Sequence, residues 1–331
     1  MKIAGNRFLI SGGASLIGSH ICDRLLADGA AEVILFDNFS LGTPDIVAAF
    51  EGDTRVKLVR GDILRPNELF DALEGVEGIF AVAAFLTLPL AANPVLGLDV
   101  NVRGMVNLLE SARYRGVGKV VFCSSVAVYG QIPDEGIQED EPLAWQGLQP
   151  AGALYAASKV IGENLCRHYS AKHGIDYVAL RYSTVYGERQ HYRGVNALYI
   201  MEAYDAIRAG RPPVLPGDGS EVHDYIYVGD VARANVMAMA SDVTGESFNV
   251  VSGIDETLND VVATLGRVTG SNIKPEYRDD TSKVRFTTTT KLGYRRDKAE
   301  RLLGWKPEVS LEEGVRRLVT WSERERRKNA A

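Results

Sequence analysis

One segment near the N-terminus limits the fold of this chain more than any other feature. An apolar run at residues 7–11 leads into a turn of small residues at 12–18, and an amphipathic helical pattern follows over 16–28. Such a turn lets the backbone approach a pyrophosphate, while the start of the helix offers free N–H donors and the positive end of its dipole. The same turn can also join a strand to a helix without any ligand. Alone, it predicts a strand–turn–helix unit and leaves the ligand open.

The alternation of strand and helix patterns continues through the first half of the chain. Near-continuous apolar runs predict buried strands, and the amphipathic stretches between them predict crossover helices. The predicted strands are 7–11, 33–37, 56–60, 78–83, 119–124 and 176–182, and the predicted helices are 16–28, 67–73, 94–115 and 153–173. This order indicates a doubly wound α/β fold, in which helices cover both faces of a parallel sheet.

The second half of the chain departs from this rhythm after about residue 186. Loops rich in proline and glycine follow, and the end of the chain is helical and polar, yet residues 225–228 and 248–251 still resemble strands of the main sheet. We therefore expect a nucleotide-binding domain over 1–186 with returning segments at about 222–252. A smaller interleaved substrate lobe, from 187–221 and 253–331, would cover the carboxyl ends of the strands, where open α/β sheets bind ligands.

Bulk properties exclude several classes of function. The 331 residues carry a net charge of −6, which gives no electrostatic basis for binding nucleic acid. The apolar stretches fall short of the roughly 20 residues that a membrane-spanning helix needs. Cys22, Cys123 and Cys166 are widely spaced in apolar segments, which indicates reduced core thiols in a cytoplasmic protein. The histidine spacing predicts no metal site.

A carboxylate follows the glycine turn at the sequence spacing that is typical of dinucleotide-binding sites. Asp37 ends the second predicted strand, nineteen residues after Gly18. An acidic residue about 20 positions on binds the ribose diol in dinucleotide sites. Residues 38–43 contain no Arg or Lys that could bind a 2′-phosphate, so the sequence favours NAD over NADP. Asp62, after the third strand, is placed to reach an adenine or serves only as a turn residue.

A tyrosine and a lysine share one face of the helix predicted at 153–173. Tyr155 and Lys159 are four residues apart, so both side chains can point into one cleft. A phenol with a pKa near 10 is a poor base at neutral pH, and a nearby cation favours its ionised form. Upstream, Ser124 and Ser125 end a strand, and one of them can bind a reacting oxygen. Each feature taken alone also has a purely structural explanation.

Together these features resemble the extended short-chain dehydrogenase/reductases, and among them the NAD-dependent epimerase/dehydratase family of nucleotide-sugar enzymes. The resemblance covers nearly the whole chain and implies a Rossmann fold, NAD as cofactor and a homodimer formed through the helices at 94–115 and 153–173. The matching motifs lie at residues 12–18, 37–38, 61–63, 101–104, 124–130, 155–159, 180–187, 217–220, 224–228, 248–250 and 302–307.

The resemblance also implies a role for particular residues. Tyr155 would be the base, Lys159 would bind the nicotinamide ribose and tune Tyr155, and Ser125 would contact the substrate hydroxyl. The implied NAD site comprises Gly12, Ser15, Leu16, Ile17, Gly18, Asp37, Asn38, Asp62, Ile63, Ala83, Asn101, Lys159 and Tyr182. The implied substrate site comprises Thr87, Ser125, Thr184, Arg193, Asn196, His223 and Arg278.

Four departures from the family pattern bear on function. Ser15 replaces the middle glycine of the turn and could crowd the pyrophosphate or donate a hydrogen bond to it. Val126 and Ala127 replace the Asp-Glu pair of the 4,6-dehydratases, which argues against dehydration. Thr184 and His223 replace an Asn and an Arg of the substrate site, and a neutral imidazole is a poor substitute for a bidentate cation at phosphate.

We therefore expect a nucleotide-sugar epimerase, with C4 as the favoured position of the sugar. The departures at Thr184 and His223 keep a second hypothesis open, an NAD-dependent dehydrogenase of a small sugar, polyol or hydroxy acid. A third, a non-catalytic NAD-sensing protein, finds support only in Ser15.

Overall fold

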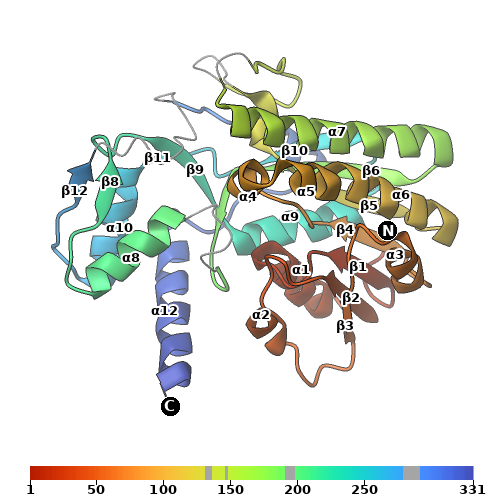
Figure 1. Cartoon of the computed structure of the whole chain (residues 1–331), viewed down its shortest axis with the longest axis horizontal. Coiled ribbons are helices and arrows are strands. Elements are labelled where there is room, and N and C mark those ends of the chain that lie inside the picture. Colours follow the sequence, from red (N-terminus) through yellow and green to blue (C-terminus); the bar gives the residue numbers. More distant parts are fainter. Residues whose placement is uncertain (131–135, 146–147, 191–197, 279–290, 331) are drawn as a thin grey trace.

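The computed structural model describes residues 1–130, 136–145, 148–190, 198–278 and 291–330. At its centre lies a parallel sheet in the strand order β10-β6-β5-β4-β1-β2-β3 (Figure 1). These strands are β1 (Arg7–Ser11), β2 (Glu32–Asp37), β3 (Val56–Arg60), β4 (Gly78–Ala81), β5 (Lys119–Ser125), β6 (Asp176–Tyr182) and β10 (Glu246–Val250). The predicted doubly wound Rossmann-type fold is confirmed.

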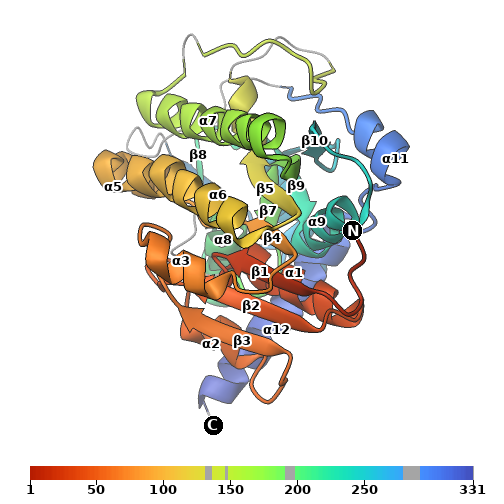
Figure 2. The same cartoon turned by 90° about the vertical axis from the view of Figure 1, so that its right-hand side faces the viewer.

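Helices cover both faces of this sheet (Figure 2). One face carries α1 (Leu16–Ala27) and α9 (Val228–Ala240), and the other carries α3 (Pro66–Ala72), α6 (Gly104–Arg115) and α7 (Pro150–His173). Alternate residues of β1 consequently enter different cores. Phe8 and Ile10 belong to the core on the α1 side, and Leu9 belongs to the core beneath α3 and α6. Burial on both faces explains why the strands are apolar without interruption.

The helices of the second face differ from the prediction in their boundaries. The segment predicted as one helix over 94–115 divides into α5 (Pro94–Leu98), a π-helical turn (Asp99–Arg103) and α6. α7 begins at Pro150, because proline is well accommodated in the first turn of a helix. Gly116 and Gly174, with φ of 72° and 70°, end α6 and α7 in the left-handed conformation.

A smaller lobe lies beyond the carboxyl ends of β5 and β6. Its sheets are β11-β9-β7 and β12-β8, and α8, α10 and α12 pack around them (Figure 1). The elements are β7 (Thr184–Tyr186), β8 (Val214–Pro216), β9 (Val222–Tyr227), β11 (Asp255–Thr257), β12 (Glu276–Arg278), α8 (Leu198–Arg208), α10 (Leu258–Thr269) and α12 (Leu311–Ala330). Short helices complete the chain: α2 (Pro44–Ala48), α4 (Thr87–Ala92) and α11 (Asp297–Leu303).

The chain returns to the main sheet once rather than twice. Residues 246–250 form β10 and pair with β6, as expected, whereas the run expected as a strand at 225–228 belongs mostly to β9, which pairs with β7 and β11. An apolar, aromatic run predicts a buried strand but does not identify its partner, which explains the difference. Among the described residues, no helix is both long and apolar enough to cross a membrane.

Candidate active site

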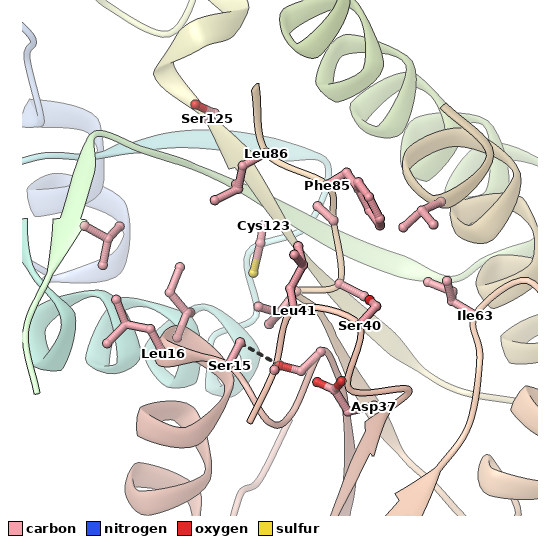
Figure 3. A pocket seen from close by; sticks show the side chains of 18 of the residues that line it. Ser15, Leu16, Asp37, Ser40, Leu41, Ile63, Phe85, Leu86, Cys123 and Ser125 are labelled. Atoms are coloured by element: carbon pink, nitrogen blue, oxygen red, sulfur yellow. Dashed lines mark hydrogen bonds between the residues drawn. The ribbon is translucent and has the colours of Figure 1, made fainter. Parts of the chain in front are cut away.

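A cleft opens at the carboxyl edge of the central sheet, facing the smaller lobe. Figure 3 shows it extending from Ser15 and Asp37 at one end to Ser125 at the other. The residues that line it come from the glycine turn, the ends of β2 to β6 and the segments that follow them, the π-helical turn, helix α7 and strand β7. They are Gly12, Ser15, Leu16, Ile17, Phe36, Asp37, Asn38, Ser40, Leu41, Gly42, Gly61, Ile63, Val82, Ala83, Ala84, Phe85, Leu86, Val100, Cys123, Ser124, Ser125, Tyr155, Lys159, Tyr182, Ser183, Val185 and Gln190.

The turn between β1 and α1 requires glycine for steric reasons. Gly12 has φ 72°, and a Cβ there would lie 2.9 Å from the backbone nitrogen of Ala83. A Cβ on Gly18 would lie 2.4 Å from the carbonyl oxygen of Gly12. The turn is therefore tightly closed, and the first two residues of helix α1, Leu16 and Ile17, line the cleft.

Ser15 fits into this turn without filling the cleft. Its hydroxyl donates a 2.6 Å hydrogen bond to the carbonyl of Gly12 and accepts a 3.1 Å hydrogen bond from the backbone N–H of Gly18. Ser15 is thus the N-cap residue of α1. The Ser15 hydroxyl is thus hydrogen-bonded to the backbone of its own turn.

Asp37 closes the other side of the turn. Its Oδ2 accepts a 2.9 Å hydrogen bond from the N–H of Ala14, and its Oδ1 accepts a 2.7 Å hydrogen bond from the N–H of Phe39. Burial raises the pKa of this carboxyl group, and the two N–H donors partly oppose the shift. Figure 3 shows the Asp37 side chain at the cleft, and the N–H groups of Ala14 and Phe39 hold its carboxylate there. The Thr43 N–H also binds the Ala14 carbonyl, which fastens the loop after β2 to the glycine turn.

Tyr155 and Lys159 both reach the cleft from α7, but the lysine does not point at the phenol. Lys159 Nζ donates to the carbonyl oxygen of Cys123 at 2.8 Å and lies 5.7 Å from the centre of the Tyr155 ring. Burial lowers the pKa of Lys159 to about 8 and raises the pKa of Tyr155 to about 12, against the effect of a hydrogen bond with Ser125. The sequence suggested that the ammonium would draw the pKa of the phenol down; in this structure burial raises that pKa, and the group that opposes the shift is Ser125.

The two serines at the end of β5 play different parts. The Ser124 hydroxyl donates a 2.6 Å hydrogen bond to Oε1 of Glu163, a residue of helix α7. The Ser125 hydroxyl accepts a 3.2 Å hydrogen bond from the N–H of Ala127 and shares a hydrogen bond with Tyr155. Of the two, Ser125 is therefore the one beside the phenol. The residues after it form a 3₁₀ turn, Val126–Tyr129, in which Val126 and Ala127 supply no acid or base.

Several predicted site residues support the cleft or lie beside it. The Asn101 side chain accepts a 2.7 Å hydrogen bond from the backbone N–H of Phe85 and donates to the Phe85 carbonyl and to the Ser158 hydroxyl. It therefore fixes the backbone at Phe85, which lines the cleft. Gly18 and Asp62 adjoin lining residues. Thr87 begins α4 immediately after Leu86, and Thr184 follows Ser183.

Two of the remaining predicted substrate residues, His223 and Arg278, lie in the smaller lobe. His223 is buried in β9, with Nε2 2.8 Å from Glu221 Oε1. Arg278 is exposed in β12 and pairs with Glu276 at 3.0 Å. Arg193 and Asn196 lie outside the described residues. In the described part of the chain, no group of His, Cys, Asp or Glu side chains could hold a metal ion.

Some lining residues carried no signal of their own in the sequence. Cys123 was expected only as a core thiol, yet it lines the cleft and accepts a 3.1 Å hydrogen bond from the Tyr182 hydroxyl. Ser183 donates to the buried Asp224 at 2.6 Å. Phe85 and Leu86 follow β4, where an apolar run gives no sign of a ligand. Position next to a recognised motif was the one available indication for these residues.

The fold and cleft together define a dinucleotide-binding enzyme with a substrate lobe above the sheet edge. The model of the NAD dependent epimerase/dehydratase family matches residues 8–251. A protein of Methanocaldococcus jannaschii, provisionally described as a UDP-glucose 4-epimerase, is 35% identical over 317 residues, covering 95% of this chain and 97% of the relative. The UDP-glucose 4-epimerase of Mycolicibacterium smegmatis is 33% identical over 325 residues, covering 95% and 97%.

Solved structures agree with this assignment. The UDP-glucose 4-epimerase of Thermus thermophilus in complex with NAD has a TM-score of 0.83 and 32% identity, covering 96% of this chain and 99% of that one. This chain belongs to the NAD-dependent epimerase/dehydratase family, and the predicted membership and cofactor are confirmed.

The residues present fit NAD. The closed glycine turn, the N-terminus of α1 and the Asp37 carboxylate suit the two phosphates and an unphosphorylated adenosine ribose, because a carboxylate at this point repels a 2′-phosphate.

Proposed function

We propose that this protein is a nucleotide-sugar epimerase that inverts C4 of its substrate. The observation that carries the proposal is the grouping of Ser125, Tyr155 and Lys159 at one end of the NAD cleft, beneath the smaller lobe. The two sequence relatives described above are named as UDP-glucose 4-epimerases, which supports a UDP-sugar as substrate.

The proposed chemistry assigns one task to each of the three residues. Tyr155 removes the proton from the C4 hydroxyl, and Ser125 donates a hydrogen bond to the oxygen as charge develops there. Lys159 binds the nicotinamide ribose and stabilises the phenolate of Tyr155. Bound NAD accepts the hydride from C4 and returns it, and its positive ring favours the phenolate in the loaded site. The keto-sugar turns over between the two transfers, so hydride returns to the opposite face.

The other site assignments are part of the same proposal. The NAD contacts are assigned to Gly12, Ser15, Leu16, Ile17, Gly18, Asp37, Asn38, Asp62, Ile63, Ala83, Asn101, Lys159 and Tyr182, and the substrate contacts to Thr87, Ser125, Thr184, Arg193, Asn196, His223 and Arg278.

Family membership alone does not select this reaction. A UDP-glucuronic acid decarboxylase of Danio rerio is 28% identical over 328 residues, covering 96% of this chain and 73% of the relative. The absence of a carboxyl side chain at Val126 and Ala127 argues against elimination of water. It does not distinguish epimerisation from decarboxylation.

The test is to incubate the purified protein with UDP-glucose, UDP-galactose, UDP-N-acetylglucosamine and UDP-glucuronate, without added NAD. We expect at least one of these sugars to be converted to its C4 epimer, with no net NADH, as followed by proton NMR and absorbance. Carbon dioxide released from UDP-glucuronate would identify a decarboxylase instead. Failure of all four sugars to react would contradict the proposal.

The surroundings of His223 favour a second candidate, an NAD-dependent dehydrogenase of a smaller sugar, polyol or hydroxy acid. Glu221 pairs with His223, and its other oxygen, Oε2, is buried without a hydrogen bond in the described part of the chain. A buried carboxylate repels a diphosphate group nearby. Stoichiometric NADH on addition of such an alcohol would establish this alternative.

We also propose a homodimer through the helices on the α6–α7 face. Large apolar side chains are exposed there: Val95 and Leu96 on α5, Tyr114 on α6, and Leu154 and Ile161 on α7. Light scattering of the purified protein should give twice the mass of the 36.1 kDa chain, and Ile161→Glu should lower it toward the monomer.

A further inference from the structure

Glu163 extends the functional face of α7 by one more turn. Tyr155, Lys159 and Glu163 are spaced by four residues and lie on one side of the helix. The end of β5 contacts two of these turns through adjacent residues: the Cys123 carbonyl accepts from Lys159 at 2.8 Å, and the Ser124 hydroxyl donates to Glu163 at 2.6 Å. The strand end that carries Ser125 is thus fastened to the helix that carries the phenol.

Arg181 holds Glu163 in a fixed position. Its Nε and Nη2 donate to the two carboxylate oxygens at 2.9 and 2.7 Å, and the two side chains are only 10% and 12% exposed. This is a bidentate pair with little rotational freedom. The remaining Nη1 donates to the Tyr129 hydroxyl and to the Glu139 carbonyl, both at 2.9 Å, which ties the guanidinium to the turn after Ser125.

The charge of Glu163 also acts on Lys159. Burial lowers the pKa of Lys159 to about 8, and Cys123 and Glu163 oppose that shift. Besides these two, Tyr155 on α7 and Tyr182 on β6 bring their hydroxyl-bearing rings to the same end of the cleft. At a pKa so close to neutrality, removal of one carboxylate changes the charge of the lysine at physiological pH.

We propose that Glu163, anchored by Arg181, is a positioning residue of the active site: it keeps Lys159 in its ammonium form and fixes the β5 end so that Ser125 faces Tyr155. It acts through Lys159 and Ser124 and does not itself line the cleft. The inference rests on the roles proposed above for Lys159 and Ser125, but the ionisation of Lys159 can be measured without any assumption about the substrate.

The experiment titrates Lys159 directly by NMR in the full chain labelled with 13C at the lysine ε-carbon, with and without NAD. The Lys159 resonance is assigned by its loss in Lys159→Met. We expect Glu163→Gln to lower the titration midpoint by about one pH unit, because the opposite charge is lost. Glu163→Asp retains the charge and should leave the Lys159 midpoint unchanged. Its shorter side chain should lose the hydrogen bond with the Ser124 hydroxyl, so we expect a lower kcat.

Two further variants guard against effects of misfolding. Glu163→Gln combined with Arg181→Met leaves no unpaired buried charge and replaces the single variant if that one does not fold. It should still lower the midpoint, because the carboxylate is the partner nearer to Lys159, but by less than the single variant, because the Arg181 cation is lost as well. Glu110→Gln, which breaks the pair of Glu110 with Arg113 and Tyr169 away from the cleft, should leave the midpoint unchanged.

The outcomes separate this inference from the proposed function. A Lys159 midpoint that is unchanged in folded Glu163→Gln or in the double variant overturns the inference, whatever sugar the enzyme uses. A lowered midpoint together with an alkaline limb of the kcat profile that moves by the same amount supports it. Inactivity of the native protein toward every UDP-sugar would count against the proposed function alone.

Discussion

The hydroxyl of Ser15 accepts a hydrogen bond from the backbone N–H of Gly18, three residues further along the same turn. A middle glycine would leave that N–H without a side-chain partner. The serine therefore caps α1 from inside the cofactor turn, and its second hydrogen bond, to Gly12, closes the loop on itself. The turn is held in shape by the protein's own atoms before any pyrophosphate arrives.

Replacement of Ser15 should show whether its side chain stabilises the start of helix α1 or hinders binding of the NAD pyrophosphate. Ser15→Ala keeps the Cβ and loses the cap, so we expect it to lower the free energy of unfolding by about 1 kcal/mol; Ser15→Gly should cost only a few tenths of a kcal/mol. Both are measured by urea denaturation without NAD. If the side chain instead crowds the pyrophosphate, Ser15→Gly will bind NAD distinctly more tightly than the native protein in calorimetry.

Asp37 should control both the affinity for the cofactor and the choice of cofactor. Asp37→Asn removes the charge that receives the ribose hydroxyls, and we expect the Kd for NAD to rise about tenfold to a hundredfold. Binding of NADP should suffer less or improve, since repulsion of a 2′-phosphate is relieved. Asp45→Asn, an exposed carboxylate in α2, is the matched control. Unchanged preference between the two cofactors would refute the assignment.

Removal of the Tyr155 hydroxyl should abolish turnover without releasing the cofactor. Tyr155→Phe keeps the buried ring and loses the proton acceptor, so we expect kcat to fall by about 10²- to 10⁴-fold. The Kd for NAD should change little, because the phenol is assigned to the substrate. Tyr114→Phe, on an exposed ring, serves as the control. Near-native turnover in Tyr155→Phe would place the base elsewhere.

Burial of Lys159 should make the stability of the NAD-free protein depend on pH. Its pKa is lowered from 10.5 to about 8 in the folded state, so between these values the unfolded chain binds more protons and stability rises with pH. Below pH 8 the folded state bears the full cost of a buried ammonium. Lys159→Met should therefore stabilise the protein at pH 7, by about 2 kcal/mol after loss of the hydrogen bond to Cys123.

That gain should shrink as the pH rises from 8 toward 10.5, as followed by urea denaturation at a series of pH values. Lys172→Met, on an exposed position of the same helix, should show no such trend. A gain independent of pH would mean that packing, rather than ionisation, explains the effect.

Most of the sheet could be predicted from the sequence, because strands buried on both faces of a parallel sheet have uninterrupted apolar sequences. The six strands predicted up to residue 182, and Asp37 at the end of the second of them, lie where expected. The apolar pattern of a strand does not show which other strand it pairs with. The run at 225–228 looked like another strand of the main sheet, yet β9 pairs with β7, since pairing depends on contacts far away in the sequence.

The cleft was predictable where a residue type and a spacing coincide, as for Tyr155 and Lys159. The direction in which a side chain points was not. Lys159 binds a carbonyl rather than the phenol, and Ser15 turns toward its own backbone. Ser124 and Ser125 are adjacent and chemically identical, so their different partners depend on where α7 lies relative to β5.

The late position of β10 in the chain has a consequence for biosynthesis. β6 ends at residue 182, but the strand that pairs with it is made only at residues 246–250, after β7, α8, β9 and α9. During that interval the backbone N–H and C=O groups along one side of β6 have no partner, and such an edge can pair with another nascent chain. A ribosome must add residues 183–250 before this edge is covered. Premature termination within that stretch would release a fragment prone to self-association.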